Sequence, residues 1–483
     1  MRLGYFSPLP PAPTGIADYS AELLPYLAHE FDIELIVSNG APRESDPALA
    51  PFPRISVAEL SNAAARLDLL LYHMGNAPMH ADIYRALCAA SPRERRRGVV
   101  VMHDVVLHHL IAWLTLGHGD KQGYIEALRA EYGEAGAELA RLETLGLTSL
   151  NRFDYPLNRT VLQSARAVIV HSEYAAQQIQ PIVPNTPIAV IPMGVKPMPA
   201  LSLTESRAAV HLPESAFIVV AFGEIQAFKR ITVILEAFAA FHAQHSDALL
   251  LLVGRESPNY DVRAVIAARE LESAVHLVGF AAPGEYEQYI GAADVCLNLR
   301  YPTAGETSAS LLRLMAAGKT TIVTRTGAFA ELPEQVCLQV EPDEYEDALL
   351  FAYLQYLAEQ PDARAAIGAQ ARRFVETCHT LEQSAAAYAD FLRTVHAGTA
   401  TSKSYLSPFQ PAPLTRLRRE NSTTPISSDS TQKPSTAPKD WFDELALNYA
   451  ELGLSADDAL LREVADALRE LGLKIERNRA DSG

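Results

Sequence analysis

Short apolar runs alternate with longer amphipathic stretches along most of this chain. In the first half, the apolar runs predict strands at residues 2–6, 33–37, 67–72, 98–102, 167–170 and 188–191. The pattern restarts in the second half, with strands predicted at residues 217–223, 248–253, 275–278, 295–299 and 320–324. Continuous apolar strands that alternate with helices indicate parallel sheets with helices on both faces.

A Pro-rich stretch at residues 192–213 separates the two patterns and marks a domain boundary. We therefore expect an α/β protein with two doubly wound, Rossmann-like domains, residues 1–195 and 196–396, that face each other across a cleft. Ligands of open α/β sheets bind at the carboxyl ends of the strands, so the cleft is the expected site. The Ser, Thr and Pro content of residues 397–439 predicts a disordered linker.

Helical periodicity returns at residues 440–483, where we expect a short helical segment. This segment is too small for a core of its own. It could dock on the main body, pair with a second copy in a homo-oligomer, or fold on binding, and the sequence leaves these alternatives open.

Charge and cysteine content narrow the class of protein. The formal net charge of the 483 residues is −17, which argues against nucleic-acid binding and allows at most a peripheral contact with a membrane. The four cysteines are scattered without metal-site or disulfide spacing, which fits a reducing compartment. No signal-peptide layout opens the sequence and no apolar run is long enough to span a bilayer. We expect a soluble, cytoplasmic protein.

The richest candidate chemistry lies around a helix predicted at residues 307–317. Glu306, Thr307 and Ser308 stand at its start, and Gly318 suits its left-handed end. A helix N-terminus carries partial positive charge and binds anions, and Arg313 adds a fixed cation. Together these groups suit a ligand with hydroxyls and a diphosphate, such as a nucleotide sugar. An ordinary capped helix is the alternative.

Further candidates follow other predicted strands. In the first half these are Gly15, Asn76, and the adjacent His103 and Asp104. Gly15 would let the backbone approach a ligand, although the dinucleotide-binding glycine pattern is absent. The remaining three are polar side chains at the cleft, suited to sugar hydroxyls; their spacing does not match a zinc motif, and we expect no metal.

In the second half, the loop after the first strand carries Gly223, Lys229 and Arg230, and two adjacent cations at a helix start match a diphosphate. Gly327 and Glu331 lie just after the last predicted strand, at the same edge of the proposed pocket. Hydrogen bonding to a ribose or sugar is one reading of Glu331, and a helix cap is the other.

At these residues the chain resembles the retaining family 4 glycosyltransferases, which have the GT-B fold. The resemblance covers residues 1–396 and is carried by the Lys229 loop, by HSEYAAQQI at 171–179 with IPMGV at 191–195, and by the block at 305–331. The form R-x-P-T-x-G-E-T-S looks like a bacterial variant. The paired glutamates of the family are replaced by Gly305 and Arg313, and Glu306 is displaced by one position.

The resemblance implies a reaction and a set of roles. The first domain would bind a glycan or glycolipid acceptor through Asn76 and Asp104, and the second a nucleotide-diphosphate sugar. The catalytic residues would be His103, Lys229 and Glu306. The implied donor-binding residues are Gly15, Gly223, Arg230, Thr307, Ser308, Arg313, Gly327 and Glu331. The family's retaining reaction needs no protein nucleophile, metal or cofactor.

Two other functions remain open at this point. One is a nucleotide-sugar epimerase of the GT-B fold, which needs its own catalytic carboxylates and histidines. The other is a non-catalytic nucleotide-sugar-binding pseudoenzyme, motivated by the altered glutamate pair and the terminal helical segment.

Overall fold

The computed structural model describes residues 1–38 and 46–411, which contain two parallel β-sheets. The first sheet has the strand order β14-β7-β6-β5-β4-β1-β2-β3. Its strands are β1 (Arg2–Phe6), β2 (Asp32–Val37), β3 (Arg54–Ser56), β4 (Leu69–Met74), β5 (Gly98–Met102), β6 (Ala167–Val170), β7 (Ile188–Val190) and β14 (Lys403–Ser404).

The second sheet has the strand order β10-β9-β8-β11-β12-β13. Its strands are β8 (Ile218–Phe222), β9 (Leu249–Val253), β10 (Val275–Gly279), β11 (Val295–Asn298), β12 (Thr320–Thr324) and β13 (Leu338–Val340). In both sheets the order reverses beside the first strand, between β1 and β4 and between β8 and β11, which is the switch point of a doubly wound fold.

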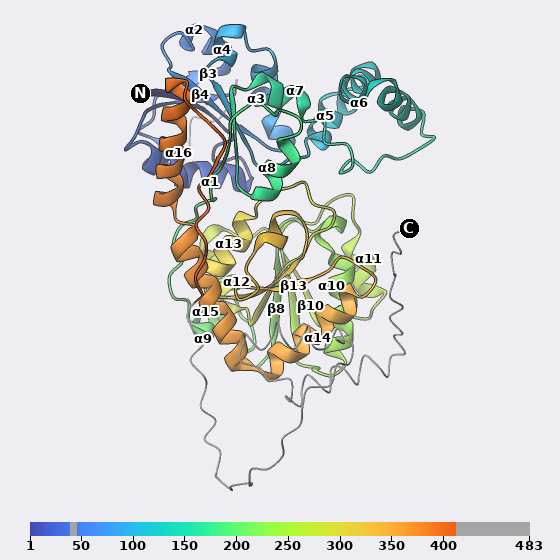
Figure 1. Cartoon of the computed structure of the whole chain (residues 1–483). Helices are drawn as coiled ribbons and strands as arrows, with labels where there is room; N and C mark the ends of the chain where they lie inside the picture. The colour runs from blue at the N-terminus through green and yellow to red at the C-terminus, as the bar shows by residue number, and fades with distance from the viewer. Residues whose placement is uncertain (39–45, 412–483) are drawn as a thin grey trace, which may run out of the picture. The chain divides into compact units, whose positions relative to one another are not determined.

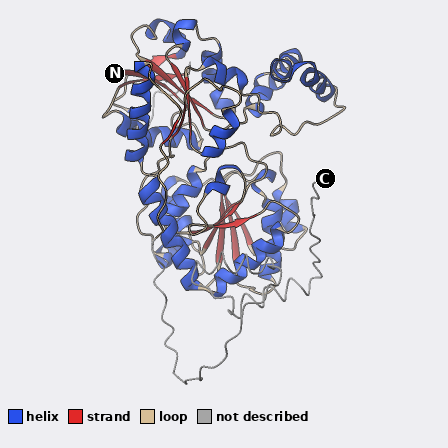
Figure 2. Cartoon of the chain, viewed as in Figure 1, coloured by secondary structure: helices blue, strands red, loops and turns tan. Residues whose placement is uncertain are grey.

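Helices cover both faces of each sheet (Figure 2). Those that follow strands of the first sheet are α1 (Gly15–Leu27), α2 (Leu60–Ala63), α3 (Ala81–Cys88), α4 (Pro92–Arg95), α5 (His108–Leu114), α6 (Lys121–Thr144), α7 (Arg159–Ser164) and α8 (Glu173–Ile179). The later helices are α9 (Leu203–Ala209), α10 (Ile231–His242), α11 (Val262–Ala267), α12 (Pro283–Ala292), α13 (Ala309–Ala316), α14 (Glu346–Glu359), α15 (Pro361–Cys378) and α16 (Leu381–Ala397).

Local sequence explains the ends of α13. The helix begins at Ala309, two residues later than predicted, because the Ser308 hydroxyl accepts the Leu311 N–H at 3.2 Å and makes Ser308 the cap. Gly318 follows the helix with a φ of +73°, as predicted. This places Glu306 and Thr307 in the turn before the helix, at the carboxyl end of β11.

The chain returns to the first sheet after α15. Helix α16 packs along α1 (Figure 1), and β14 then pairs in parallel with β7. The Tyr405 N–H donates to Val190 O at 2.7 Å, and the ring of Phe409 packs on Phe374 of α15 at a centroid distance of 5.3 Å.

The structure differs here from the linker predicted at residues 397–439. Residues 403–409 supply backbone hydrogen bonds to the open edge of β7 and apolar side chains to the core, so this stretch is ordered. The rest of that linker and the helical segment predicted at 440–483 lie outside the described residues. Across residues 1–38 and 46–411, no helix combines the length and apolarity that crossing a bilayer would need.

Candidate active site

Lys229 presents its amine beside the carboxyl end of β8. It ends a short 3-10 helix, η5 (Ala227–Lys229), and Gly223 precedes it with a φ of +106°. A Cβ at Gly223 would lie 3.6 Å from Lys229 Nζ, so glycine keeps the loop backbone close to the amine. Among the described residues, none forms a hydrogen bond or salt bridge with this amine. It is therefore available to a ligand.

Burial, and then the positive charge of Arg300, lower the pKa of the Lys229 amine to about 7. Glu306 and Glu224 act in the opposite direction but do not restore it. When the protonated form of an amine is destabilised in the free protein, a bound anion stabilises that form most. The electrostatics thus favour a negatively charged ligand at Lys229.

Arg300 and Glu306 form a buried ion pair at the carboxyl end of β11. The Arg300 guanidinium pairs with Glu306 and also donates to Ser308 Oγ at 3.1 Å. The second carboxylate oxygen accepts the Thr303 hydroxyl and the Ala304 N–H, both at 2.9 Å. Burial raises the pKa of Glu306, but Arg300 outweighs it by charge and hydrogen bond, so the pKa stays below its ordinary value. Glu306 is held as a carboxylate.

The loop that follows β5 of the first sheet contacts the loop that follows β11 of the second. The N–H groups of Val105 and Val106 donate to Ala304 O at 2.7 and 3.0 Å. Gly305 has a φ of +84°, and a Cβ there would come within 2.6 Å of a Val105 methyl. A side chain at position 305 would force these loops apart.

Asp104 lies at this contact, one residue before Val105. Its Oδ2 accepts the Asn76 N–H at 2.7 Å. Burial, and then the negative charge of Glu306, raise the pKa of Asp104 to about 7. Asp104 and Glu306 thus differ in protonation. The Asp104 carboxyl can exchange a proton near neutral pH, whereas the Glu306 carboxyl is ionised.

We call Asp104, Lys229, Arg300 and Glu306 the charged cluster. The sequence analysis had named three of them and missed Arg300. The available signal was its position, because Arg300 is the charged residue directly after a buried apolar strand, where side chains face the cleft.

His103 lies within a stack of buried rings. Its Nε2 is 2.9 Å from His73 Nδ1, and the Tyr19 and His171 rings lie 5.7 and 5.1 Å from its ring. Burial, with His171 nearby, holds the pKa of His103 well below its ordinary value, so the ring is neutral. Its Nδ1 has no hydrogen-bond partner among the described residues. Contact with a donor sugar stays a prediction for this residue.

Asn76 is engaged with helix α5. Its amide nitrogen is 2.9 Å from His109 Nδ1, and its side-chain oxygen accepts the Leu110 N–H at 3.2 Å. Gly15 is exposed at the start of α1, with open space around the position of a Cβ. Gly327 has a φ of +53° and packs closely on Thr303.

Arg230 and Arg313 already have carboxylate partners, unlike Lys229. The Arg230 Nε donates to the buried Glu346 of α14 at 2.7 Å. The Arg313 guanidinium donates to Glu22 of α1 at 3.0 Å. Their predicted contacts with a diphosphate would have to compete with these ion pairs.

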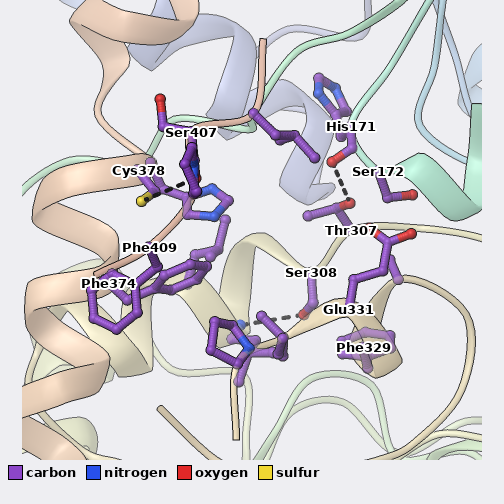
Figure 3. A pocket seen from close by; sticks show the side chains of 18 residues that line it. His171, Ser172, Thr307, Ser308, Phe329, Glu331, Phe374, Cys378, Ser407 and Phe409 are labelled. Carbon is purple, nitrogen blue, oxygen red and sulfur yellow. Dashed lines mark hydrogen bonds between the residues drawn. The ribbon is translucent and has the colours of Figure 1, made fainter. Parts of the chain in front are cut away.

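Thr307, Ser308 and Glu331 line a cavity of about 240 Å³, which we call the α13 pocket (Figure 3). The Thr307 hydroxyl donates to His171 O at 3.4 Å. The Glu331 carboxylate accepts the N–H of Glu173 at 3.2 Å and that of Tyr174, so it caps the start of α8. Glu331 thus acts as a helix cap in this structure, and its hydrogen bonding to a ribose or sugar stays a prediction.

The charged cluster provides two cations, one fixed carboxylate and one carboxyl that titrates near neutrality. Within the parts of the chain that the structure describes, no three His, Cys, Asp or Glu side chains are placed to hold a metal ion. The cluster can neutralise a diphosphate through Lys229 and Arg300 and can accept hydrogen bonds from hydroxyls.

Comparisons with known proteins agree with this arrangement. Residues 216–359, which contain the second sheet and three members of the charged cluster, match the family model described as glycosyl transferases group 1. A search of curated proteins finds no match.

Solved structures share the two-sheet architecture. Sucrose-phosphate synthase from Thermosynechococcus elongatus superimposes with a TM-score of 0.60 at 18% identity, covering 82% of this chain and 100% of that one. HepE from Anabaena, solved in complex with UDP-glucose, gives 0.59 at 15% identity over 82% of this chain and 100% of its own. WaaG, a glycosyltransferase involved in lipopolysaccharide biosynthesis, gives 0.54 at 16% identity over 81% and 99%.

At these identities the superpositions establish the fold alone, and the family match concerns the second sheet. Residues 216–359 therefore match the glycosyl transferases group 1 model, and the chain has a two-sheet α/β fold similar to that of GT-B glycosyltransferases.

Proposed function

We propose that the protein is a retaining, metal-independent glycosyltransferase that moves a sugar from a nucleotide-diphosphate sugar to a glycan or glycolipid acceptor. The observation that carries the proposal is the unpartnered amine of Lys229, which lies with Arg300 and Glu306 at the carboxyl ends of β8 and β11. The group 1 match covers the same segment.

The donor would place its diphosphate at Lys229. In glycosyl transfer the bond between the anomeric carbon and the phosphate oxygen breaks, so negative charge develops on the leaving diphosphate. Cations held beside that oxygen stabilise the transition state more than the ground state. Lys229 would meet the charge directly. Arg300, fixed by Glu306 and Ser308, would contribute through its field.

Glu306 would orient the donor sugar. Its carboxylate is held by Arg300, Thr303 and the Ala304 N–H, so the position of its oxygens is set before substrate arrives. A preorganised acceptor of hydrogen bonds limits the rotation of bound sugar hydroxyls. Retention would follow from attack on the same face, with the leaving phosphate taking the acceptor's proton.

Asp104 would face the acceptor from the first sheet, with His103 beside it. With a pKa near 7, the Asp104 carboxyl can accept a hydrogen bond from an acceptor hydroxyl and share its proton near neutrality. The contact between Val105 and Ala304 would exclude water from the space between the two loops. We further propose that the protein works in the cytoplasm, where nucleotide sugars are available.

The test measures nucleotide release and sugar transfer by the full-length protein with a panel of nucleotide sugars, in buffer containing EDTA. UDP-glucose is the first donor to try, because HepE was solved with it. Lys229→Met should lower kcat/KM by about 100- to 1000-fold. Lys121→Met is the matched control, since Lys121 is exposed and its amine donates to Thr144 O at 3.1 Å.

Transfer with retained anomeric configuration, read by NMR of the product, supports the proposal. Equal activity of the two lysine variants would refute the diphosphate site. Epimerisation of the donor sugar in the absence of acceptor would show that the protein is an epimerase and not a transferase. Donor binding without turnover on any acceptor would point to a pseudoenzyme.

A further inference from the structure

Four segments of the chain form most of the lining of the α13 pocket. These are the N-terminal half of α13 with its preceding turn, the segment around Phe329 that follows β12, the end of α15, and residues 406–409. His171 and Ser172, just before α8, complete the lining. Figure 3 shows Phe374, Cys378, Ser407 and Phe409 on one side of the cavity and Thr307, Phe329 and Glu331 on the other. Lys229 and Arg300, to which the proposed function assigns the diphosphate, do not line this cavity.

Most of the lining is apolar, with leucines, phenylalanines and prolines from all four segments. Several of the polar groups are already engaged with the protein, whereas the buried Nε2 of His171 has no hydrogen-bond partner among the described residues. Ser308 caps α13, Ser172 accepts the Ala175 N–H at 3.2 Å, and the Thr307 hydroxyl donates to a backbone carbonyl. Glu331 caps α8. What the cavity offers a ligand is therefore mainly apolar surface, with the Thr307 hydroxyl oxygen able to accept a hydrogen bond. Ser308 Oγ already accepts the Leu311 N–H and an Arg300 N–H.

Residues 406–409 form the outer wall of the pocket. Ser407 and Pro408 are exposed to solvent and belong to no helix or strand. The wall is fixed at both ends, by the pairing of β14 with β7 and by the packing of Phe409 on Phe374. The outer wall of the pocket, at Ser407 and Pro408, thus belongs to neither sheet.

We propose that the α13 pocket binds one apolar chain of medium length that ends in a hydroxyl, as in an alkanol or the lipid portion of a glycolipid. An apolar cavity of about 150 Å³ binds benzene, so a cavity of about 240 Å³ has room for roughly eight carbons and a hydroxyl. The chain fills the apolar interior, and its hydroxyl lies near the Thr307 hydroxyl.

A ligand bound in the α13 pocket would also affect the charged cluster. Thr307 and Ser308 directly follow Glu306, and Ser308 Oγ receives a hydrogen bond from Arg300 at 3.1 Å. A ligand that packs against this turn restricts the position of Glu306. This part of the inference rests on the proposed function, whereas binding itself does not.

The binding test uses isothermal titration calorimetry of the full-length protein with straight-chain 1-alkanols from butanol to dodecanol, without any nucleotide or sugar. Affinity should rise about fourfold per methylene up to roughly eight carbons and then level off. Leu332→Trp should abolish binding by filling the cavity. Leu332→Ala should move the plateau to a longer chain.

Leu203→Trp and Leu203→Ala are the matched controls, because Leu203 is a partly exposed leucine on α9 that does not line the pocket. The proposal is overturned if the wild-type protein binds no alkanol. It is also overturned if both Leu332 variants bind alkanols with the same affinity and chain-length dependence as wild type. The Leu332→Ala variant keeps the test decisive if Leu332→Trp fails to fold.

Kinetics distinguish the two sources of such a chain. If octanol raises the KM for a glycolipid acceptor, the pocket holds the acceptor's own lipid. If octanol changes kcat and leaves that KM unchanged, the pocket takes a separate amphiphile. Alkanol binding by a protein with no transferase activity would support the proposed binding site and contradict the proposed function.

Discussion

At the scale of single residues, the structure turns the sequence's list of polar candidates into a small group with specified charges. Lys229 is the member with the clearest consequence for pH. Its pKa is about 7 in the free protein because burial and Arg300 disfavour its charged form, and a bound diphosphate would raise that pKa. Above pH 7 the free amine is largely neutral, so donor binding must take up a proton.

We therefore expect the affinity for nucleoside diphosphate to fall by up to tenfold per pH unit above about 7, as one proton is taken up. Calorimetry at pH 6 and pH 8, in buffers with different ionisation enthalpies, measures the proton uptake directly. It should be near zero at pH 6, approach one at pH 8, and disappear in Lys229→Met. An affinity that is flat from pH 6 to 9 contradicts the assignment.

Asp104 gives a prediction about stability. Its pKa is raised to about 7 in the folded state, above the ordinary value of 3.8, because of burial and Glu306. The unfolded chain therefore releases this proton at lower pH, and stability is lost as the pH rises from about 4 through 7. Asp104→Asn removes the titrating group and should melt at a higher temperature than wild type at pH 8, with the difference shrinking towards pH 4.

Asp68→Asn is a suitable control for the stability measurement, since Asp68 likewise accepts a backbone N–H, that of Arg2 at 2.8 Å, but at an exposed position. The same Asp104→Asn variant should lose transfer activity. A melting difference that is independent of pH would show that Asp104 does not titrate as the geometry implies.

At the scale of elements, Glu331 joins two segments that are distant in sequence. It stands in η6 (Gly327–Glu331), after β12, and its carboxylate caps the start of α8. Loss of such a cap costs about 1 kcal/mol, and the negative charge also suits a helix N-terminus. Glu331→Ala should lower the melting temperature by about 3 °C.

The kinetic effect of Glu331→Ala separates the two readings of this residue. As a cap alone, it should leave the KM for the donor within about twofold of wild type. A rise of tenfold or more in that KM would instead support the predicted contact of Glu331 with the nucleotide. Glu334→Ala, an exposed carboxylate three residues away, controls for the change in surface charge.

Most elements could be predicted because their residues carry a local signal. The central strands read as continuous apolar runs, and the Ser308 cap and Gly318 mark the ends of α13. The strands that the sequence analysis missed, β3, β13 and β14, have two or three residues each and lie at sheet edges, so their apolar pattern is too short to recognise. They form because a neighbouring strand offers unpaired backbone groups.

The sequence alone could not predict which charged side chains form ion pairs. Lys229 and Arg230 are adjacent cations, yet Arg230 pairs with Glu346, more than a hundred residues away, and Lys229 forms no ion pair or hydrogen bond with any described residue. Arg313 is similarly taken by Glu22. Such contacts depend on how distant elements pack, and a local pattern carries no information about them.

At the scale of the whole molecule, the segment after α16 ties together parts of the chain that the sequence places far apart. Pairing of β14 with β7, the hydrogen bond from the Ile188 N–H to Ser402 Oγ at 3.0 Å, and the contact of Phe409 with Phe374 all depend on residues 402–409. From the sequence alone, residues 397–439 were expected to be a disordered linker.

The structure makes a different prediction for two truncated chains, 1–410 and 1–397. Both should unfold cooperatively, because both sheets and α16 are present. The shorter chain exposes the edge of β7 and the Phe374 side of the α13 pocket, so it should melt several degrees lower. It should also bind octanol at least tenfold more weakly, since it lacks the wall formed by residues 406–409. Equal melting temperatures and equal octanol affinities of the two chains, measured by calorimetry, would show that this segment neither supports the fold nor closes the pocket.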